Sequence, residues 1–355
     1  MNKAVVFVNP APSKSPQISA FKFLKVIAPF FSKVSIVSTN LDETPDAEVF
    51  NVKYKKQSNP VLRVLGFILF QFRLLFKSLS VVKKGDFVFF WIGDKMFTPM
   101  LVSKLKGAKT YFFHYQIPTL ESDSRKARST VKGQNFMARV ADFVCAESPA
   151  AITDRGLALD ERTKILHLFV DDLQNDSIKE NKIGMLCRIA KGKCVLESIE
   201  AFAQFHTLYP QYTLEIVGDG IQFDECKNKI EELKARDYII MHGWLSHDEL
   251  FKIMPEWKLL LFPTKTEGLP NSVLESMSMS IPALCSTAGG LKDMITDNVN
   301  GYILPDEEVD TIYKKLCYIF ESDTLEYVSQ QAKDTINNKY TLEKARENFK
   351  SQMGF

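Results

Sequence analysis

Short apolar, β-rich runs alternate with helical stretches along nearly the whole chain, and this order limits the possible folds more than any other feature. Several runs are apolar without the every-second-residue alternation of a half-exposed strand, as expected for strands covered on both faces. The pattern predicts an α/β fold built on parallel sheets. The predicted strands cover residues 4–8, 34–38, 87–92, 110–114, 143–146, 165–169, 182–187, 213–217, 238–241, 258–262 and 282–286.

The length of 355 residues suits two domains better than one, and two similar domains would form a cleft. The polar stretch 171–181 has no apolar periodicity and is the predicted linker. We therefore expect a Rossmann-like domain over residues 1–171, a second over 172–338, and a last helix within 339–355.

Charge and cysteine usage narrow the function classes. The formal net charge is +2, which argues against nucleic acid as a partner, so any anion binding must be local. The six cysteines are scattered without a C-x-x-C motif, which favours buried thiols and a reducing, cytoplasmic location. The short apolar run before Pro10 is typical of a first strand, not of a signal peptide.

The most informative stretch is 262–286, where a buried strand leads through a loop carrying Glu267 into a helix that opens near Pro270 and carries Glu275. Proline suits a first helical position. The N–H groups from residue 271 to about 274 should then lack intrahelical partners and lie at the positive end of the helix dipole. Such a helix end can receive an anion.

The same residues resemble the E-x7-E signature of retaining glycosyltransferases with the GT-B fold, the large family 4 type. The resemblance implies a first domain that binds the acceptor, a second that binds a nucleotide-sugar donor, and a last helix, 339–355, that crosses back to the first domain. It also implies that Glu267 contacts the donor sugar and Glu275 the ribose. The backbone between them would hold sugar hydroxyls and phosphate, at Gly268, Leu269, Asn271, Ser272, Val273 and Leu274.

Two cations follow the first strand of the second half. Arg188 and Lys193 are five residues apart across a strand-to-helix turn, so both side chains can converge beyond the sheet edge. Relatives read G-R-x-x-x-x-K-G here, with both cations on the donor diphosphate, whereas Cys187 and Cys194 replace the two glycines in this chain. Lys191 is an alternative to Lys193, and two solvated surface cations are the plain alternative to a site.

Three further positions are candidates because they lie at predicted strand ends, where open parallel sheets bind ligands. His114 ends the strand 110–114, where family members often carry a His or Asp beside the donor sugar; a hydrogen-bonded structural histidine is the alternative. Gly218 lets the backbone approach a ligand, and Gly243 corresponds to a glycine near the base in relatives.

The sequence predicts chemistry without a metal or other cofactor. No Asp-x-Asp motif occurs, and His242 and His247 have no carboxylate or cysteine at metal-ligand spacing. Two fixed cations and a helix N-terminus can stabilise a departing diphosphate by preorganised charge alone. A retaining outcome follows from the resemblance only.

The most hydrophobic segment is 61–79, which carries Arg63, Gly66, Arg73 and Lys77 on one helical arc of about 80°. Three cations argue against a transmembrane helix. Two interpretations stay open: a crossover helix facing the core, or an interfacial helix whose cations, with Lys83 and Lys84, contact an anionic membrane surface through residues 61–84. Both can hold together.

The hypothesis is therefore a retaining, metal-independent glycosyltransferase that moves a sugar from a nucleotide-diphosphate donor to a glycan or lipid-linked acceptor in bacterial surface polysaccharide assembly. It would act in the cytoplasm, or peripherally on the inner face of the membrane. Two alternatives remain: a sugar-nucleotide epimerase on the same fold, and a non-catalytic binding protein. The second stays open because the turn after residue 8 lacks the paired glycines of the family.

Overall fold

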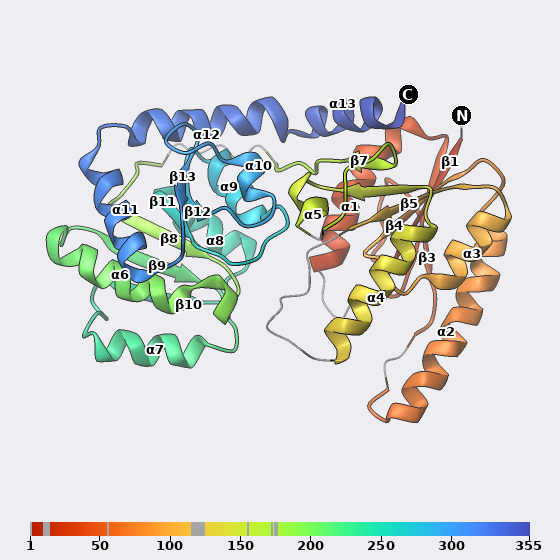
Figure 1. Cartoon of the computed structure of the whole chain (residues 1–355), viewed down its shortest axis with the longest axis horizontal. Coiled ribbons are helices and arrows are strands. Elements are labelled where there is room, and N and C mark those ends of the chain that lie inside the picture. The colour runs from red at the N-terminus through yellow and green to blue at the C-terminus, as the bar shows by residue number, and fades with distance from the viewer. Residues whose placement is uncertain are drawn as a thin grey trace. The chain divides into compact units, whose positions relative to one another are not determined.

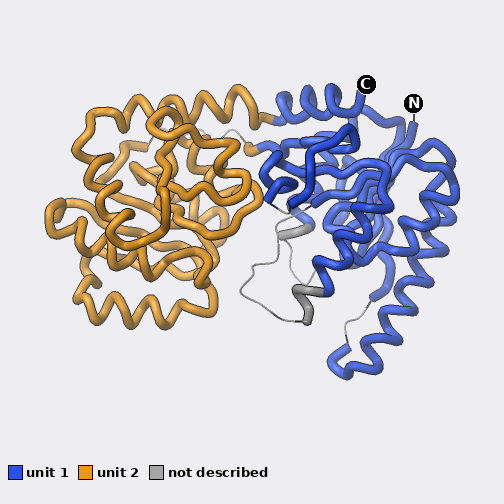
Figure 2. The backbone as a smooth tube through the Cα atoms, viewed as in Figure 1, with its two compact units in different colours: residues 1–169, 342–355 blue, residues 170–341 orange. Residues whose placement is uncertain are grey.

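The computed structural model describes residues 2–9, 15–54, 57–114, 125–154, 156–171, 173 and 177–355. The chain forms two compact units (Figures 1 and 2). Unit 1 comprises Met1–Phe169 and Leu342–Phe355, and unit 2 comprises Val170–Thr341. Each unit is an α/β body with its own sheet. In the predicted linker, the described residues 171, 173 and 177–181 lie in no helix or strand, and residues 10–14 of the turn after the first strand lie outside the described residues.

Unit 1 contains a seven-stranded sheet in the order β3-β2-β1-β4-β5-β6-β7, and every neighbouring pair is parallel. Its strands are β1 Lys3–Val8, β2 Lys33–Ser38, β3 Glu48–Asn51, β4 Phe87–Trp91, β5 Lys109–Phe113, β6 Phe143–Ala146 and β7 Thr163–Ile165. Its helices are α1 Ser15–Ile27, α2 Pro60–Val81, α3 Phe97–Leu105, α4 Arg125–Val140, α5 Ala150–Thr153 and α13 Leu342–Met353, with a 3-10 turn at Ala28–Phe30.

The C-terminal helix belongs to unit 1 because its apolar side packs into that unit's core. Ala345 and Phe349 are fully buried, and the Phe349 ring lies 6.4 Å from Phe23 and 5.3 Å from Phe30, centroid to centroid. The Arg346 guanidinium donates a hydrogen bond to the backbone oxygen of Lys25 at the end of α1. The chain therefore leaves unit 1 after β7 and returns to it with α13.

Unit 2 contains a six-stranded parallel sheet in the order β10-β9-β8-β11-β12-β13. Its strands are β8 Lys182–Leu186, β9 Thr213–Val217, β10 Ile239–Gly243, β11 Trp257–Phe262, β12 Ala283–Ser286 and β13 Tyr302–Leu304. Its helices are α6 Val195–Leu208, α7 Phe223–Glu232, α8 His247–Ile253, α9 Asn271–Ser278, α10 Leu291–Met294, α11 Val309–Glu321 and α12 Leu325–Lys339, with 3-10 turns at Lys191–Lys193 and Met254–Glu256.

One glycine fixes how closely the central strands of unit 2 pack. A Cβ on Gly184 of β8 would lie 1.9 Å from the indole of Trp257 on the neighbouring β11, so only glycine fits there. The Trp257 indole N–H donates to the buried Glu215 carboxylate of β9 over 2.7 Å. The indole is thereby held across the sheet and links β8, β9 and β11.

The parallel α/β architecture predicted from the alternation is confirmed. The predicted strand 165–169 is wrong in position, because pairing with β6 covers only Thr163–Ile165 and the His167 N–H instead binds the Asn348 side chain of α13. Two short edge strands, β3 and β13, were not predicted. All the parallel strands of unit 2 end at one edge, where the turns after β8 to β12 meet.

Candidate functional site

The turn after β8 presents one lysine to the interior and one arginine to solvent. Arg188 is exposed, as is Lys191, whereas Lys193 is only 9% exposed. The 3-10 turn Lys191–Lys193 ends at Cys194, whose backbone is left-handed with φ 49° and ψ 39°. Lys193, not Lys191, is therefore the lysine that turns toward the sheet edge.

Lys193 is bound to the loop after β11. Its Nζ donates to Thr264 Oγ1 and to the Thr266 carbonyl oxygen, each over 3.2 Å, and forms an ion pair with Glu267. The backbone of the two loops is joined as well, since the Lys265 N–H donates to the Gly192 carbonyl oxygen over 2.9 Å. The contact brings together two residues that the sequence predicted for one site but did not predict to touch.

The loop that carries Glu267 is held from its other side by the turn after β12. The Gly290 N–H donates to the Gly268 carbonyl oxygen over 2.7 Å, and a Cβ on Gly289, which has φ +54°, would lie 1.8 Å from the Glu267 carbonyl oxygen. Thr264 is fixed similarly, because its N–H donates to Ser286 Oγ over 3.1 Å. Three strand ends therefore fix the position of the Glu267 backbone.

Helix α9 begins one residue later than predicted. Pro270 is its N-cap, with φ −74° and ψ 121°, and not its first helical residue. The N–H groups of Val273 and Leu274 both donate to the Pro270 carbonyl oxygen over 3.2 Å, so the expectation that they lack intrahelical partners is wrong. Asn271, which is exposed, and Ser272 supply the N–H groups at the positive end of the helix.

Glu275 lies in the second turn of α9 and is 8% exposed. The Nε2 atom of His247 lies 3.9 Å from its carboxylate oxygen. His247 is the first residue of α8, which is fixed by a capping box between Ser246 and Glu249. His247 was weighed only as a metal ligand, so its approach to Glu275 was not predicted. Its position right after the turn that follows β10 was the sequence feature that could have indicated it.

Two predicted glycines lie at neighbouring strand ends. A Cβ on Gly218, which has φ +143°, would lie 1.9 Å from the Cys187 carbonyl oxygen, and the Gly218 N–H donates to the Gly243 carbonyl oxygen over 2.8 Å. Burial raises the pKa of the Cys187 thiol to about 12, so this residue brings no negative charge to the turn of Arg188. Backbone packing between turns explains Gly218.

His114 follows β5 in unit 1 and is 2% exposed, with its ring edge-on to Phe112. Other polar residues lie at strand ends of the same sheet. Asn9, after β1, donates to Asp94, after β4, and burial raises the pKa of the Asp94 carboxyl despite the nearby Lys95. Burial also raises the pKa of Glu147, after β6, to about 7. No sequence pattern indicated Asp94 or Glu147.

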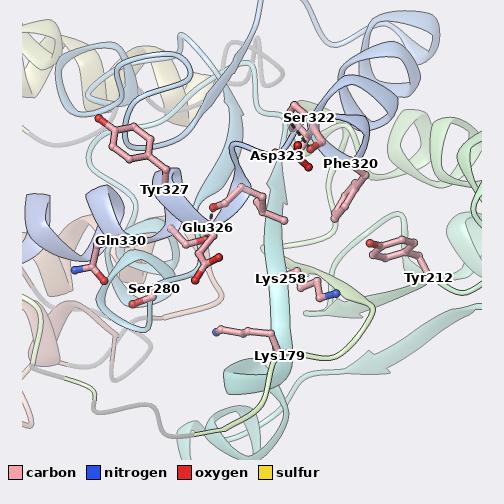
Figure 3. A pocket seen from close by; sticks show the side chains of 13 residues that line it. Lys179, Tyr212, Lys258, Ser280, Phe320, Ser322, Asp323, Glu326, Tyr327 and Gln330 are labelled. Carbon is pink, nitrogen blue, oxygen red and sulfur yellow. Dashed lines mark hydrogen bonds between the residues drawn. The ribbon is translucent and has the colours of Figure 1, made fainter.

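The described part of the chain contains no group of three or more His, Cys, Asp or Glu side chains placed to hold a metal ion. A pocket of about 930 Å³ lies in unit 2 at the opposite edge of the sheet, where Lys179, Tyr212 and Ser280 precede β8, β9 and β12 (Figure 3). Because the predicted site residues of unit 2 lie at the carboxyl edge, this pocket is separate from them.

Residues 172–341 match the family model described as glycosyl transferases group 1. Over 301 residues, and 80% of each chain, the sequence is 22% identical to the N-acetylgalactosamine-N,N'-diacetylbacillosaminyl-diphospho-undecaprenol 4-alpha-N-acetylgalactosaminyltransferase of Campylobacter jejuni. It is 28% identical over 162 residues to the UDP-N-acetylglucosamine–peptide N-acetylglucosaminyltransferase GtfA subunit of Streptococcus gordonii; that match covers 43% of this chain but only 31% of the relative.

The fold of the whole chain is similar to that of Anabaena HepE in its crystal structure with UDP. The two align with a TM-score of 0.80 over 100% of both chains at 16% identity. The fold is therefore of the GT-B type, as the sequence predicted.

Proposed function

We propose that this chain, whose residues 172–341 match the glycosyl transferases group 1 family model, is a glycosyltransferase that moves a sugar from a nucleoside-diphosphate sugar to a glycan or lipid-linked acceptor, with retention and without a metal. Unit 2 is the proposed donor-binding unit and unit 1 the acceptor-binding unit. The observation that carries the proposal is the junction of Lys193 with Glu267 directly before helix α9, on a loop anchored by three strand ends.

The donor diphosphate is proposed to bind between Arg188 and the start of α9. The Arg188 side chain is exposed and can pair with phosphate oxygens, and the N–H groups of Asn271 and Ser272 add positive potential. The Lys193 ammonium already has three oxygen partners, so it would exchange one of them for a phosphate oxygen. Together these groups stabilise the charge that gathers on the diphosphate as it leaves.

The carboxylates of Glu267 and Glu275 have different proposed roles. Glu267 is held by Lys193, so it is suited to orient hydroxyls of the donor sugar and not to attack its anomeric carbon. Glu275 is the proposed ribose contact, because a nearly buried carboxylate accepts hydrogen bonds from hydroxyl groups. His247 lies close enough to position that carboxylate.

The reaction is proposed to proceed on one face of the sugar. The bond from the anomeric carbon to the diphosphate oxygen breaks as the acceptor hydroxyl oxygen bonds to that carbon, and the hydroxyl proton passes to the departing diphosphate. This route needs neither a nucleophilic carboxylate nor a metal ion. In unit 1, His114 keeps its predicted role beside the donor sugar, and the strand-end residues Asp94 and Glu147 are the proposed acceptor-side contacts.

The acceptor class rests on the relatives. The name of the Campylobacter jejuni enzyme includes a diphospho-undecaprenol acceptor, and its alignment covers 80% of this chain. A polyprenyl-diphosphate-linked sugar is therefore the first acceptor class to test. The matching location is the cytoplasm, or the inner face of the cytoplasmic membrane, within bacterial surface polysaccharide assembly.

The test has two stages. Nucleoside diphosphates, UDP first, are screened by thermal stabilisation in EDTA, and the matching sugar nucleotides are then incubated with and without lipid-linked acceptors. We expect turnover only with an acceptor and with the anomeric configuration kept. Glu275→Ala should weaken donor binding, and Arg188→Ala should slow transfer more than it weakens acceptor binding. Conversion of the donor alone would indicate an epimerase, and nucleotide binding without turnover in the acceptor screen would indicate a binding protein.

A further inference from the structure

Helix α2 leaves most of its apolar surface outside the core of unit 1. Only Phe70, Leu74 and Ser78 are buried among its 22 residues. Nine large apolar side chains are exposed by 45–68%, namely Val61, Leu62, Val64, Leu65, Ile68, Leu69, Phe72, Phe76 and Leu79. At 100° per residue these nine cover an arc of about 160° on the side away from the buried stripe.

This exposed arc has a border of one charge sign. Arg73 and Lys77 lie between this arc and the buried stripe, about 20° and 60° beyond the edge of the arc, and the exposed Lys83 and Lys84 follow the end of the helix. The segment 60–84 contains no Asp or Glu. The Arg73 guanidinium donates to the Lys53 carbonyl oxygen over 2.7 Å, and the Lys77 ammonium lies 3.2 Å from the Phe50 ring centroid, so both cations are fixed along the border.

The neighbouring helix adds to the same pattern. Helix α3 packs against α2 (Figure 1) and exposes Leu101 by 57% and Leu105 by 79%. The Lys106 ammonium, just after α3, donates to the Val82 carbonyl oxygen over 2.7 Å and places another cation at the end of α2.

We propose that the α2 face, defined as these nine exposed apolar side chains with Arg73, Lys77, Lys83 and Lys84, lies on an anionic lipid bilayer surface. Its apolar arc would sink to the boundary of headgroups and acyl chains, and its cations would contact the lipid phosphates. A second copy of the chain fits the face less well, because packing two such faces together brings like charges close.

The helix rests on the membrane and does not cross it. The helix has 22 residues, and an 18-residue stretch of it has a mean hydropathy of 1.6, so its length and composition would allow a span. Its buried stripe, however, is part of the unit 1 core, and the Gln71 side chain donates to the Lys95 carbonyl oxygen over 2.9 Å. A span would break these contacts and place Arg73 within the hydrocarbon layer, which is costly.

The test is sedimentation of the full chain with two kinds of vesicle, pure phosphatidylcholine and equal parts phosphatidylcholine and phosphatidylglycerol, at low and high NaCl. We expect binding to the anionic vesicles that falls with salt. Lys83→Ala/Lys84→Ala should weaken partitioning of the protein onto the anionic vesicles about 30-fold, because each lysine near an anionic surface contributes about 1 kcal/mol. Phe72→Ser/Phe76→Ser should weaken the same partitioning at least about 10-fold, because two large apolar side chains would no longer be buried in the bilayer. None of these side chains is in the donor site, so activity on a soluble acceptor should not change.

Matched controls separate the face from general effects. Lys252→Ala/Lys339→Ala removes the same number of exposed lysines from unit 2, and Leu208→Ser/Ile221→Ser removes two exposed apolar side chains from it. Both should bind vesicles as the wild type does, with melting temperatures of all variants alike. Absence of sedimentation, equal loss in the controls, or salt-insensitive binding to both vesicle types would overturn the proposal. The proposal would also be overturned if the chain formed a dimer that Phe72→Ser/Phe76→Ser dissociates and did not bind vesicles.

Discussion

Replacing Lys193 with methionine tests whether the ion pair at the loop junction fixes the donor site. The side chains of Lys193 and Glu267 are only 10% and 12% exposed, so the methionine variant leaves a carboxylate nearly buried without its cation. Removing one partner of such a pair costs about 3–5 kcal/mol, of which the lost hydrogen bonds to Thr264 and Thr266 are a part. We therefore expect the free energy of unfolding of unit 2 to fall by about 3–5 kcal/mol.

The double variant Lys193→Met/Glu267→Gln distinguishes this cause from loss of packing. It removes both charges, so it should recover roughly half or more of the lost stability, as replacements of whole buried pairs do. Urea unfolding followed by tryptophan fluorescence, to which Trp257 of the unit 2 core contributes, measures each value. A loss below about 1 kcal/mol in Lys193→Met, or no recovery in the double variant, would show that the ion pair does not stabilise the loop junction.

Other substitutions follow from burial and backbone geometry. Gly184→Ala should lower the free energy of unfolding by about 3 kcal/mol, because its Cβ would overlap the Trp257 ring; urea unfolding within about 1 kcal/mol of wild type would contradict this. Cys194→Gly should be about 1 kcal/mol more stable than Cys194→Ala, because glycine adopts the left-handed backbone without strain, and equal urea midpoints would count against that. The pKa of Glu147 is raised to about 7 by burial, so its protonated form stabilises the fold at low pH and this contribution is lost as pH rises from about 4.5 to 7. The free energy of unfolding of Glu147→Gln, relative to that of the wild type, should therefore rise by about 2 kcal/mol across this pH range, a value discounted for the partial exposure of Glu147. If the two free energies of unfolding changed in parallel with pH, this expectation would be wrong.

The sequence predicted the sheets well because their strands are buried on both faces and read as apolar runs, such as β4 and β11. It missed β3 because that strand is short, lies at the sheet edge and contains only partly buried and exposed residues. It displaced β7 because residues 166–169 are as apolar as a strand but pack in the core without continuing the sheet.

The candidate site was predictable in its residue types but not in its contacts. The spacing of Arg188 and Lys193 placed both after β8, yet only the 3-10 turn at Lys191–Lys193 decides that Lys193 turns inward. Proximity of Glu275 to His247 depends on how the α8 and α9 starts meet at the carboxyl edge, which no local pattern encodes. Pro270 was predicted one residue too far into the helix, because proline is over-represented at the first helical position and not at the N-cap that it occupies here.

We propose above that side-chain cations and a helix end bind the donor diphosphate without a metal. Calorimetry in EDTA should compare a nucleoside diphosphate with its nucleoside, on wild type and on Arg188→Ala, whose exposed side chain can be removed without disturbing the fold. We predict that the diphosphate binds at least about 100-fold tighter than the nucleoside, and that Arg188→Ala cuts this advantage about 10-fold while nucleoside binding stays constant. Binding that requires added Mg²⁺, or an advantage unchanged in Arg188→Ala, would mean that these groups do not hold the diphosphate.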